Sequence, residues 1–206
     1  MTNYSTVLSE TVSIREEIKI YIKNPFNPEN LKQLSALGEK RWVNWRYKIG
    51  DRDDELKKDT KVPYSTTGWK TDVTNPKNWS TLEEVLSVND RFDGIGIAFD
   101  DRLLGIDIDH CLKNGIITHE KKEKIEAFLA KLNSYVETSP SNEGLHGFLS
   151  LTAPLDLTGR HRHEPFELYA DKRFFTVTSS SYGELKPVRA VTPEEALSIL
   201  AIIDFP

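Results

Sequence analysis

Alternating apolar and polar residues predict that much of this chain forms β-strands. Residues 94–100 (GIGIAFD) and 103–109 (LLGIDID) alternate with the period of two that is typical of strands. Shorter β-branched or aromatic stretches predict further strands at 41–48, 61–64, 135–138, 145–151, 166–169 and 174–178. Strands and helices mix without strict alternation, so we predict an α+β fold, with a mixed or antiparallel sheet core and flanking helices.

Short polar turns separate several of these strands. The dipeptide Asp101-Arg102 lies between the first two strands and predicts a β-hairpin. Asp171-Lys172 separates 166–169 from 174–178 in the same way and predicts a second hairpin. A turn rich in Ser, Pro, Asn and Gly separates 135–138 from 145–151.

Capping residues predict the starts of four helices. Prolines follow the first and last candidate N-caps directly, Ser80 and Glu83 have the spacing of a capping box, and Gly38 is placed to end the first helix. The candidate N-caps are Asn27, Ser80, Thr118 and Thr192.

Composition places the chain among ordinary globular proteins. It has 206 residues and a formal net charge of −5, and it holds a single cysteine, Cys111. One cysteine cannot form an internal disulfide, so we expect a buried, reduced thiol. No apolar run approaches the roughly 20 residues that span a bilayer, and the polar first residues are unlike a signal peptide. We therefore expect a cytoplasmic protein without a membrane partner.

The net charge hides an uneven distribution. Residues 40–77 hold ten Lys and Arg against six acids, whereas residues 90–110 hold six Asp against two Arg. An acidic centre beside a basic flank is one way to bind divalent metal and a polyanion together. The alternative is a normally solvated surface, which charge alone does not exclude.

The strand at 103–109 carries the strongest candidate site. Because side chains alternate, Asp107 and Asp109 share the face opposite Leu104, Ile106 and Ile108. The two carboxylates stand about 7 Å apart along the strand, a spacing that suits one or two divalent cations. Gly105 on the same face is expected to leave room for a ligand. The alternative is an exposed strand face with two solvated carboxylates.

Two further segments hold residue types suited to phosphate chemistry. Ser139, Ser141 and His146 border a tight turn and could form a phosphate cradle, or only a hairpin turn with an incidental histidine. Glu167 lies inside the apolar strand FELY and therefore needs a partner. That partner is either a bound cation or, across the predicted hairpin, Arg173 or Lys172.

Taken together, these segments resemble a known family. RWVNWRYK, KVPYSTTG, DGIGIAFD, GIDIDHC, YVETSPSNEGLH, FELY and RFFTVTS occur in the order typical of the primase-polymerase domain of the archaeo-eukaryotic primase superfamily. The similarity is to the type found at the N-terminus of phage and plasmid primase-helicases, and it covers about residues 29–180. We therefore expect a catalytic domain at 29–206 with an RRM-like catalytic fold, and an extension at 1–28 to which no role is assigned.

The resemblance implies a nucleotidyltransferase, a DNA primase or polymerase. Asp107, Asp109 and Glu167 would be catalytic and would hold two Mg²⁺ or Mn²⁺ ions. The residues expected to contact the phosphates of the incoming NTP or dNTP are His146, Arg173, Ser139, Ser141 and Lys61. Glu143 departs from the glycine-rich turn common in relatives and adds a negative charge near this site.

The resemblance also implies partners. Single-stranded or primed DNA would lie on the basic flank 40–77 and on the run 160–163 (RHRH), in a bacterial or archaeal host cell. No Walker A sequence occurs, so a helicase would be another chain or a further domain. Two alternatives remain open: a metal-dependent nuclease or nucleotide-sugar transferase, and a catalytically silent DNA-binding module.

Overall fold

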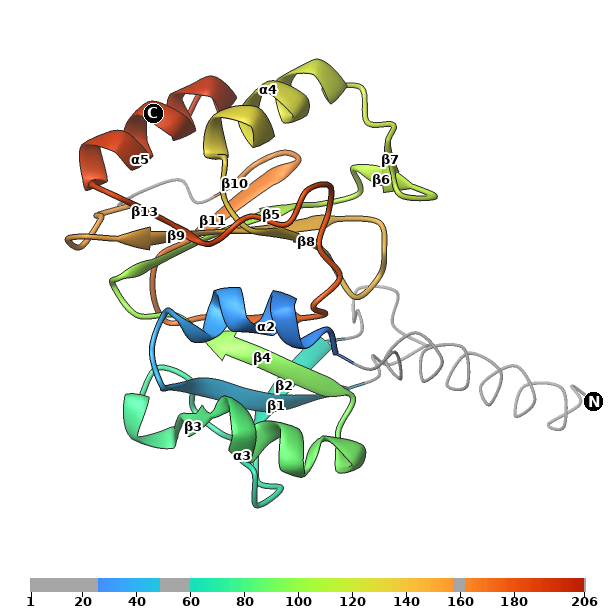
Figure 1. Cartoon of the computed structure of the whole chain (residues 1–206), viewed down its shortest axis with the longest axis vertical. Helices are drawn as coiled ribbons and strands as arrows, with labels where there is room; N and C mark the ends of the chain where they lie inside the picture. The colour runs from blue at the N-terminus through green and yellow to red at the C-terminus, as the bar shows by residue number, and fades with distance from the viewer. Residues whose placement is uncertain (1–25, 49–59, 158–161, 206) are drawn as a thin grey trace, which may run out of the picture.

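Two β-sheets form the framework of the protein (Figure 1). The computed structural model describes residues 26–48, 60–157 and 162–205. Most of the predicted extension 1–28, together with Arg160 and His161, lies outside these residues. The described helices are α2 (Pro28–Ser35), α3 (Leu82–Ser87), α4 (Lys122–Leu132) and α5 (Pro193–Leu200), with short 3-10 turns at η1 (Pro76–Asn78), η2 (Asn89–Arg91) and η3 (Ala201–Ile203).

One sheet has five strands and the other has six. The five-stranded sheet has the order β12 (Phe174–Val177), β4 (Gly94–Ala98), β1 (Lys40–Lys48), β2 (Thr60–Tyr64), and β3 (Ser80–Thr81) also pairs with β1. The six-stranded sheet has the order β10 (Arg162–His163), β11 (Phe166–Tyr169), β5 (Leu103–Ile108), β9 (Leu145–Leu151), β13 (Arg189–Val191), and β8 (Val136–Thr138) also pairs with β9. A small hairpin joins β6 (Leu112–Lys113) to β7 (Ile116–Ile117). Because β13 runs parallel to β9 and the other pairs are antiparallel, the predicted α+β fold with a mixed sheet is confirmed.

Both predicted two-residue hairpins are wrong. β4 and β5 belong to different sheets, and so do β11 and β12. The strands have exchanged partners, since β4 pairs with β12 and β5 pairs with β11. The segments that join β4 to β5 and β11 to β12 pass from one sheet to the other. They are hydrogen-bonded to each other, since the amide of Phe99 donates to the carbonyl of Arg173 at 2.9 Å. The Phe99 side chain is buried, whereas Asp101 and Arg102 of the turn that follows are exposed, so the chain leaves the core here before it enters the other sheet.

Local signals were more reliable for helix starts and for the third turn. Asn27 and Thr192 cap α2 and α5 as predicted, and β8 and β9 are antiparallel partners around the predicted turn. The capping box lies one residue later than predicted, at Thr81 and Glu84. The predicted cap at Thr118 is wrong, because α4 begins at Lys122 and has no side-chain cap.

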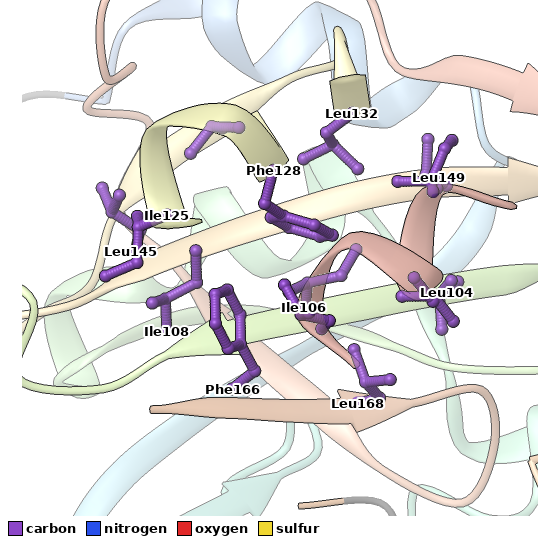
Figure 2. Close-up of a cluster of buried hydrophobic side chains, with 14 of the residues drawn as sticks. Leu104, Ile106, Ile108, Ile125, Phe128, Leu132, Leu145, Leu149, Phe166 and Leu168 are labelled. Atoms are coloured by element: carbon purple, nitrogen blue, oxygen red, sulfur yellow. The ribbon is translucent and has the colours of Figure 1, made fainter. Parts of the chain in front are cut away.

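Alternate residues of the six-stranded sheet form one large apolar core. We call the face that carries Leu104, Ile106 and Ile108 the outer face, and α4 and α5 cover it (Figure 1). Figure 2 shows how side chains from β5, β9 and β11 meet those of α4 there, and the rings of Phe128 and Phe166 pack edge to face with centroids 5.3 Å apart. Burial of this apolar surface is the main stabilising contribution of the sheet.

The opposite, inner face of the same sheet is apolar only toward the starts of β5 and β8 and the middle of β9. There Leu103, Tyr135 and Phe148 join Phe99 and Phe175 in a second core shared with the five-stranded sheet and α2. Gly105 lies in this packing, and a Cβ at its position would come within 2.4 Å of the Phe99 ring. Gly105 therefore makes room for two aromatic rings, and the expectation that it leaves space for a ligand is wrong.

Two smaller expectations can be compared with the structure directly. Cys111 is free and buried, as predicted, and its thiol donates to the carbonyl of Ile108. Within the described residues, no helix combines the length and the apolar character needed to cross a bilayer.

Candidate active site

Four polar side chains lie side by side across four strands of the inner face. The strand register places Glu167 of β11 opposite Asp107 of β5, Asp107 opposite His146 of β9, and His146 opposite Glu137 of β8. Directly opposed residues point to the same side of a sheet, so these four form one continuous row. We call it the polar row.

Asp109 extends the polar row beyond the end of β5. The strand ends at Ile108, and the amide of Asp109 donates to the carbonyl of Pro165 at 2.9 Å, which holds the backbone beside β11. Only Asp107 lies within the strand itself, and Asp109 is close enough for its charge to act on Asp107.

Electrostatic crowding is concentrated on Asp107. Burial, followed by the negative charge of Asp109, raises the pKa of Asp107 to about 7, and Glu167 adds to this effect while Lys61 opposes it. The pKa of Asp109 is also raised, chiefly by burial and then by Glu167. Burial and neighbouring negative charge thus oppose ionisation of both Asp107 and Asp109.

Lys61 brings a positive charge to the carboxylates from the other sheet. It lies on β2, and burial lowers its pKa while Asp107 and Asp109 act in the opposite direction. The structure therefore brings Lys61 near both predicted metal ligands, which no local pattern in the sequence indicated.

His146 is buried and has a defined tautomer. Its Nδ1 lies 3.0 Å from the backbone carbonyl oxygen of Thr176, and a carbonyl can only accept, so Nδ1 carries the proton. Its Nε2 faces Asp107, with 3.8 Å between Nε2 and Oδ1. Burial, followed by the charge of Lys61, lowers the pKa of His146 to about 3, so the ring is neutral and Nε2 presents a lone pair.

Glu137 is the member of the polar row that sequence reasoning missed. It is fully buried and accepts hydrogen bonds from the Tyr135 hydroxyl and from the backbone amides of Thr178 and Ser179, each at 2.9 Å. Burial raises its pKa to about 7 in spite of these donors. Its alternation with Val136 was the available signal, because it places Glu137 and Tyr135 on the face opposite the apolar core.

The side chains that contact Glu167 are not those that the hairpin alternative offered. Its carboxylate accepts from Arg162 Nε at 2.8 Å and from the Tyr169 hydroxyl. The expected partners Arg173 and Lys172 do not serve this role: the Arg173 guanidinium lies over the Tyr169 ring, 5.4 Å from its centroid, and Lys172 pairs with Asp171. Arg173 is thus close to the polar row, with Tyr169 between it and Glu167.

The serine turn is adjacent to Asp109. The hydroxyls of Ser139 and Ser141 lie 3.0 Å apart, and Ser139 Oγ accepts from the amide of Gly144. A Cβ on Gly144 would come within 2.9 Å of the Ile108 carbonyl oxygen and 3.7 Å of Asp109 Cα, so turn and strand are in close contact. Glu143 is exposed, and its carboxylate lies 3.5 Å from His110 Nδ1.

A pocket of about 140 Å³ opens beside Asp109. The residues that line it are Asp109, His110, His119, Arg162, Glu164 and Pro165. Arg162 and His163 of the predicted basic run form β10 and are exposed. The run therefore borders the site through Arg162, which pairs with Glu167.

The donor set suits a hard divalent cation, although the described residues contain no group of three or more His, Cys, Asp or Glu with metal-site spacing. Asp107, Asp109 and Glu167 offer carboxylate oxygens, the ligands that Mg²⁺ and Mn²⁺ prefer. The raised pKa of Asp107 reflects an excess of negative charge that a bound cation would offset. By chemistry, the residues fit the expected metals.

Comparison with known proteins gives one informative similarity. No family model matches the chain. In an alignment of 178 positions that covers 82% of the chain, it is 30% identical to a protein described as a DNA primase-polymerase from Nitratiruptor phage NrS-1. The chain spans only 22% of the length of that curated relative.

Proposed function

Because this chain carries a primase-polymerase domain, we propose that it is a template-directed nucleotidyltransferase of phage or plasmid replication. It would join an NTP or dNTP to a primer 3′-hydroxyl, or start primers de novo, on single-stranded or primed DNA. Its place of action would be the cytoplasm of a bacterial or archaeal host, where these substrates occur. A helicase, as a separate chain or a further domain, is the proposed partner.

One observation carries this proposal. Asp107 and Glu167 are directly opposed on neighbouring strands, Asp109 follows Asp107 at the strand end, and Lys61 approaches from the other sheet. A cluster of carboxylates with one nearby lysine is suited to holding cations and phosphate groups together. The homology extends over 82% of the chain and supports assigning this cluster to nucleotidyl transfer.

Asp107, Asp109 and Glu167 are the residues that would hold the two ions. When bound, Mg²⁺ or Mn²⁺ would make the primer hydroxyl more acidic and neutralise the charge of the triphosphate. Arg162 and Tyr169 contact the Glu167 carboxylate and so help to position it beside Asp107. Phosphoryl transfer depends mainly on positioning and charge stabilisation, and a preorganised row of side chains supplies the positioning.

The other candidate residues would orient the nucleotide. Lys61 is the cation best placed to contact a phosphate that sits at Asp107 and Asp109. The lone pair of His146 Nε2 would accept a hydrogen bond from a donor on the substrate, since the neutral ring has no charge to offer. Arg173 would contact phosphates from the far side of Tyr169, and the hydroxyls of Ser139 and Ser141 would do so beside Asp109.

A primer-extension assay tests the proposal. The chain is incubated with primed DNA, Mn²⁺ or Mg²⁺ and labelled nucleotides, and the length of the primer is followed. We expect longer strands from the unmodified chain and none above background from Asp107→Asn or Asp109→Asn. Asp101→Asn, at an exposed position on the turn before β5, is the matched control and should extend primers normally.

The alternative functions predict different results in the same primer-extension assay. A nuclease would shorten the primer, and a nucleotide-sugar transferase would leave its length unchanged. A silent DNA-binding module would bind the primed template without metal-dependent turnover. Any of these three results would overturn the proposed function.

A further inference from the structure

Trp69 is the most exposed large apolar side chain of the described residues. It is 77% exposed, whereas Trp42, Trp45 and Trp79 are 0%, 2% and 8% exposed, and the sequence contains no other tryptophan. Leaving an indole in water forgoes a large favourable burial free energy. Trp69 is therefore the one tryptophan of the chain whose ring is open to a ligand.

The loop that carries Trp69 is held in one conformation by its own hydrogen bonds. The amide of Ser65 donates to the carbonyl of Trp69 at 2.8 Å, and the amide of Gly68 donates to the carbonyl of Ser65 at 2.9 Å. Lys70 pairs with Tyr64 as an isolated bridge that closes the loop. The ring is thus presented on a well-bonded support, so binding through it would lose little conformational entropy.

Three cationic side chains lie on or beside this loop. Arg91 donates to the carbonyl of Thr66, and Arg46 donates to the carbonyl of Arg91 at 2.9 Å. Arg46 also lies over the ring of Phe92, 4.8 Å from its centroid, and Lys70 next to Trp69 is exposed. The nearby carboxylate of Asp72 already accepts two hydrogen bonds from Thr74.

We propose that Trp69 stacks on a base of single-stranded nucleic acid while Lys70 and Arg91 contact its phosphates. This inference rests on the proposed function, because the strand would be the template leading into the site. Trp69 follows β2, whose other end carries Lys61, so the two are separated by about 10–15 Å along the strand. Aromatic stacking together with a basic groove is the usual chemistry of single-strand binding.

A protein partner would fit this surface less well. A protein interface normally has a contiguous apolar centre. The other exposed large apolar residues in the described part of the chain lie on different segments: Ile116 on β7, Leu197 on α5, and Leu185 before β13. An isolated indole among arginine and lysine matches the flat face of a base and its charged backbone better.

Binding of oligothymidylate tests the proposal, with fluorescence anisotropy for affinity and tryptophan emission for contact. We expect emission to be quenched, because Trp69 is the one exposed indole. Trp69→Ala should lower affinity about tenfold, and Trp69→Phe, which keeps a stacking ring, should lower it less than about threefold. Ile116→Ala, at another exposed apolar position, is the matched control and should bind normally.

An oligomer of the same length made of abasic units separates stacking from charge. It keeps the phosphates but offers no base, so Trp69→Ala should bind it as well as the unmodified chain does. An equal loss on both oligomers, or no loss on either, would overturn the proposal.

Primer extension distinguishes this failure from failure of the proposed function. If the chain extends primers but Trp69→Ala has normal affinity and a normal KM for template, only the stacking inference fails. If the chain extends no primer but Trp69 is quenched and needed for affinity, the stacking inference holds and the proposed function fails.

Discussion

The two faces of the six-stranded sheet are built from the same strands and serve opposite purposes. On the outer face, Leu104, Ile106 and Ile108 pack with α4 and α5 in the large apolar core. On the inner face, Asp107 lies between Glu167 and His146 in the polar row. A shift of one residue along β5 thus separates a position where burial stabilises the fold from one where burial opposes ionisation.

This contrast indicates how the fold tolerates its site. Burying a leucine or isoleucine side chain contributes about 1.5–3 kcal/mol, and the outer face contains many such side chains. Burial of the polar row opposes folding instead, because burial and neighbouring like charges disfavour ionised Asp107 and raise its pKa to about 7. The even-numbered residues of β5, on the outer face, therefore supply most of the stability, and Asp107 on the inner face supplies the proposed chemistry.

The largest expected effect is on activity, from Asp107→Asn. Loss of a carboxylate that would hold a cation should lower the rate of primer extension by about 1,000-fold or more. The same substitution should leave the metal-free protein as stable as before or more stable at pH 8, because it removes a charge from a crowded site. Primer extension and thermal unfolding in EDTA measure the two effects, and a clear loss of stability would contradict the contrast between the faces.

The next largest effect is on stability, from Ile106→Ala, one residue away on the outer face. Truncating this fully buried side chain should lower the free energy of unfolding by about 2–5 kcal/mol. Urea denaturation measures the change, and Ile116→Ala at an exposed position is the control. Below the unfolding transition the variant should still extend primers, and a specific loss of activity there would show that the faces are not independent.

Glu137→Gln should have a smaller effect on both properties. The Glu137 carboxylate accepts hydrogen bonds from two backbone amides. In glutamine, one carboxylate oxygen is replaced by an NH₂ group, which would face one of these N–H donors and could not accept its hydrogen bond. We expect a loss of about 1–3 kcal/mol of stability. We also expect a higher KM for the nucleotide, because Thr178 and Ser179 follow the strand whose Thr176 carbonyl contacts His146. Glu123→Gln, at an exposed position on α4, is the control, and equal behaviour of the two variants would refute the role of Glu137.

The smallest expected effect is the pH dependence of the metal-free protein. The pKa of Asp107 is raised from 3.8 to about 7, so the folded state holds a proton that the unfolded state has already lost. The contribution of Asp107 to stability should therefore fall by about 1–2 kcal/mol as pH rises from about 5.5 to about 7, since fewer protons are bound to the unfolded chain at this position. His146, with its pKa lowered from 6.5 to about 3, contributes in the opposite direction, so the Asp107 contribution is the difference from Asp107→Asn. Denaturation in EDTA at a series of pH values checks this, with Asp107→Asn as the reference that lacks this contribution. A dependence of the same size in Asp107→Asn would assign it to other groups, such as Glu137.

Sequence patterns predicted the elements better than their partners. The caps at Asn27 and Thr192 depend only on nearby residues, and both are correct. The turns at Asp101-Arg102 and Asp171-Lys172 do reverse the chain, but each leads into the other sheet. A two-residue turn signal describes a local change of direction, whereas the choice of sheet depends on how Phe99 and Phe175 pack around Gly105.

The candidate site shows the same division. The positions of Asp107 and Glu167 on the polar side of their strands followed from alternation alone. The contacts of Glu167 with Arg162 and Tyr169 did not, since β10 and β11 were not predicted as a pair and the only protein partners considered were Arg173 and Lys172. Glu137 was overlooked because its alternation with Val136 indicates only which face it lies on, and not that the side chain is buried.

By itself, the sequence determined which side chains share a face, because the period of a strand is a property of the backbone and needs no partner. That was enough to separate the apolar positions of β5 from its carboxylates and to support the family resemblance. Only the tertiary structure decided which strands lie next to one another, and hence that Glu167, Asp107, His146 and Glu137 form one row. Strand pairing is settled by burial between segments far apart in the chain, and no short stretch of residues encodes that free energy.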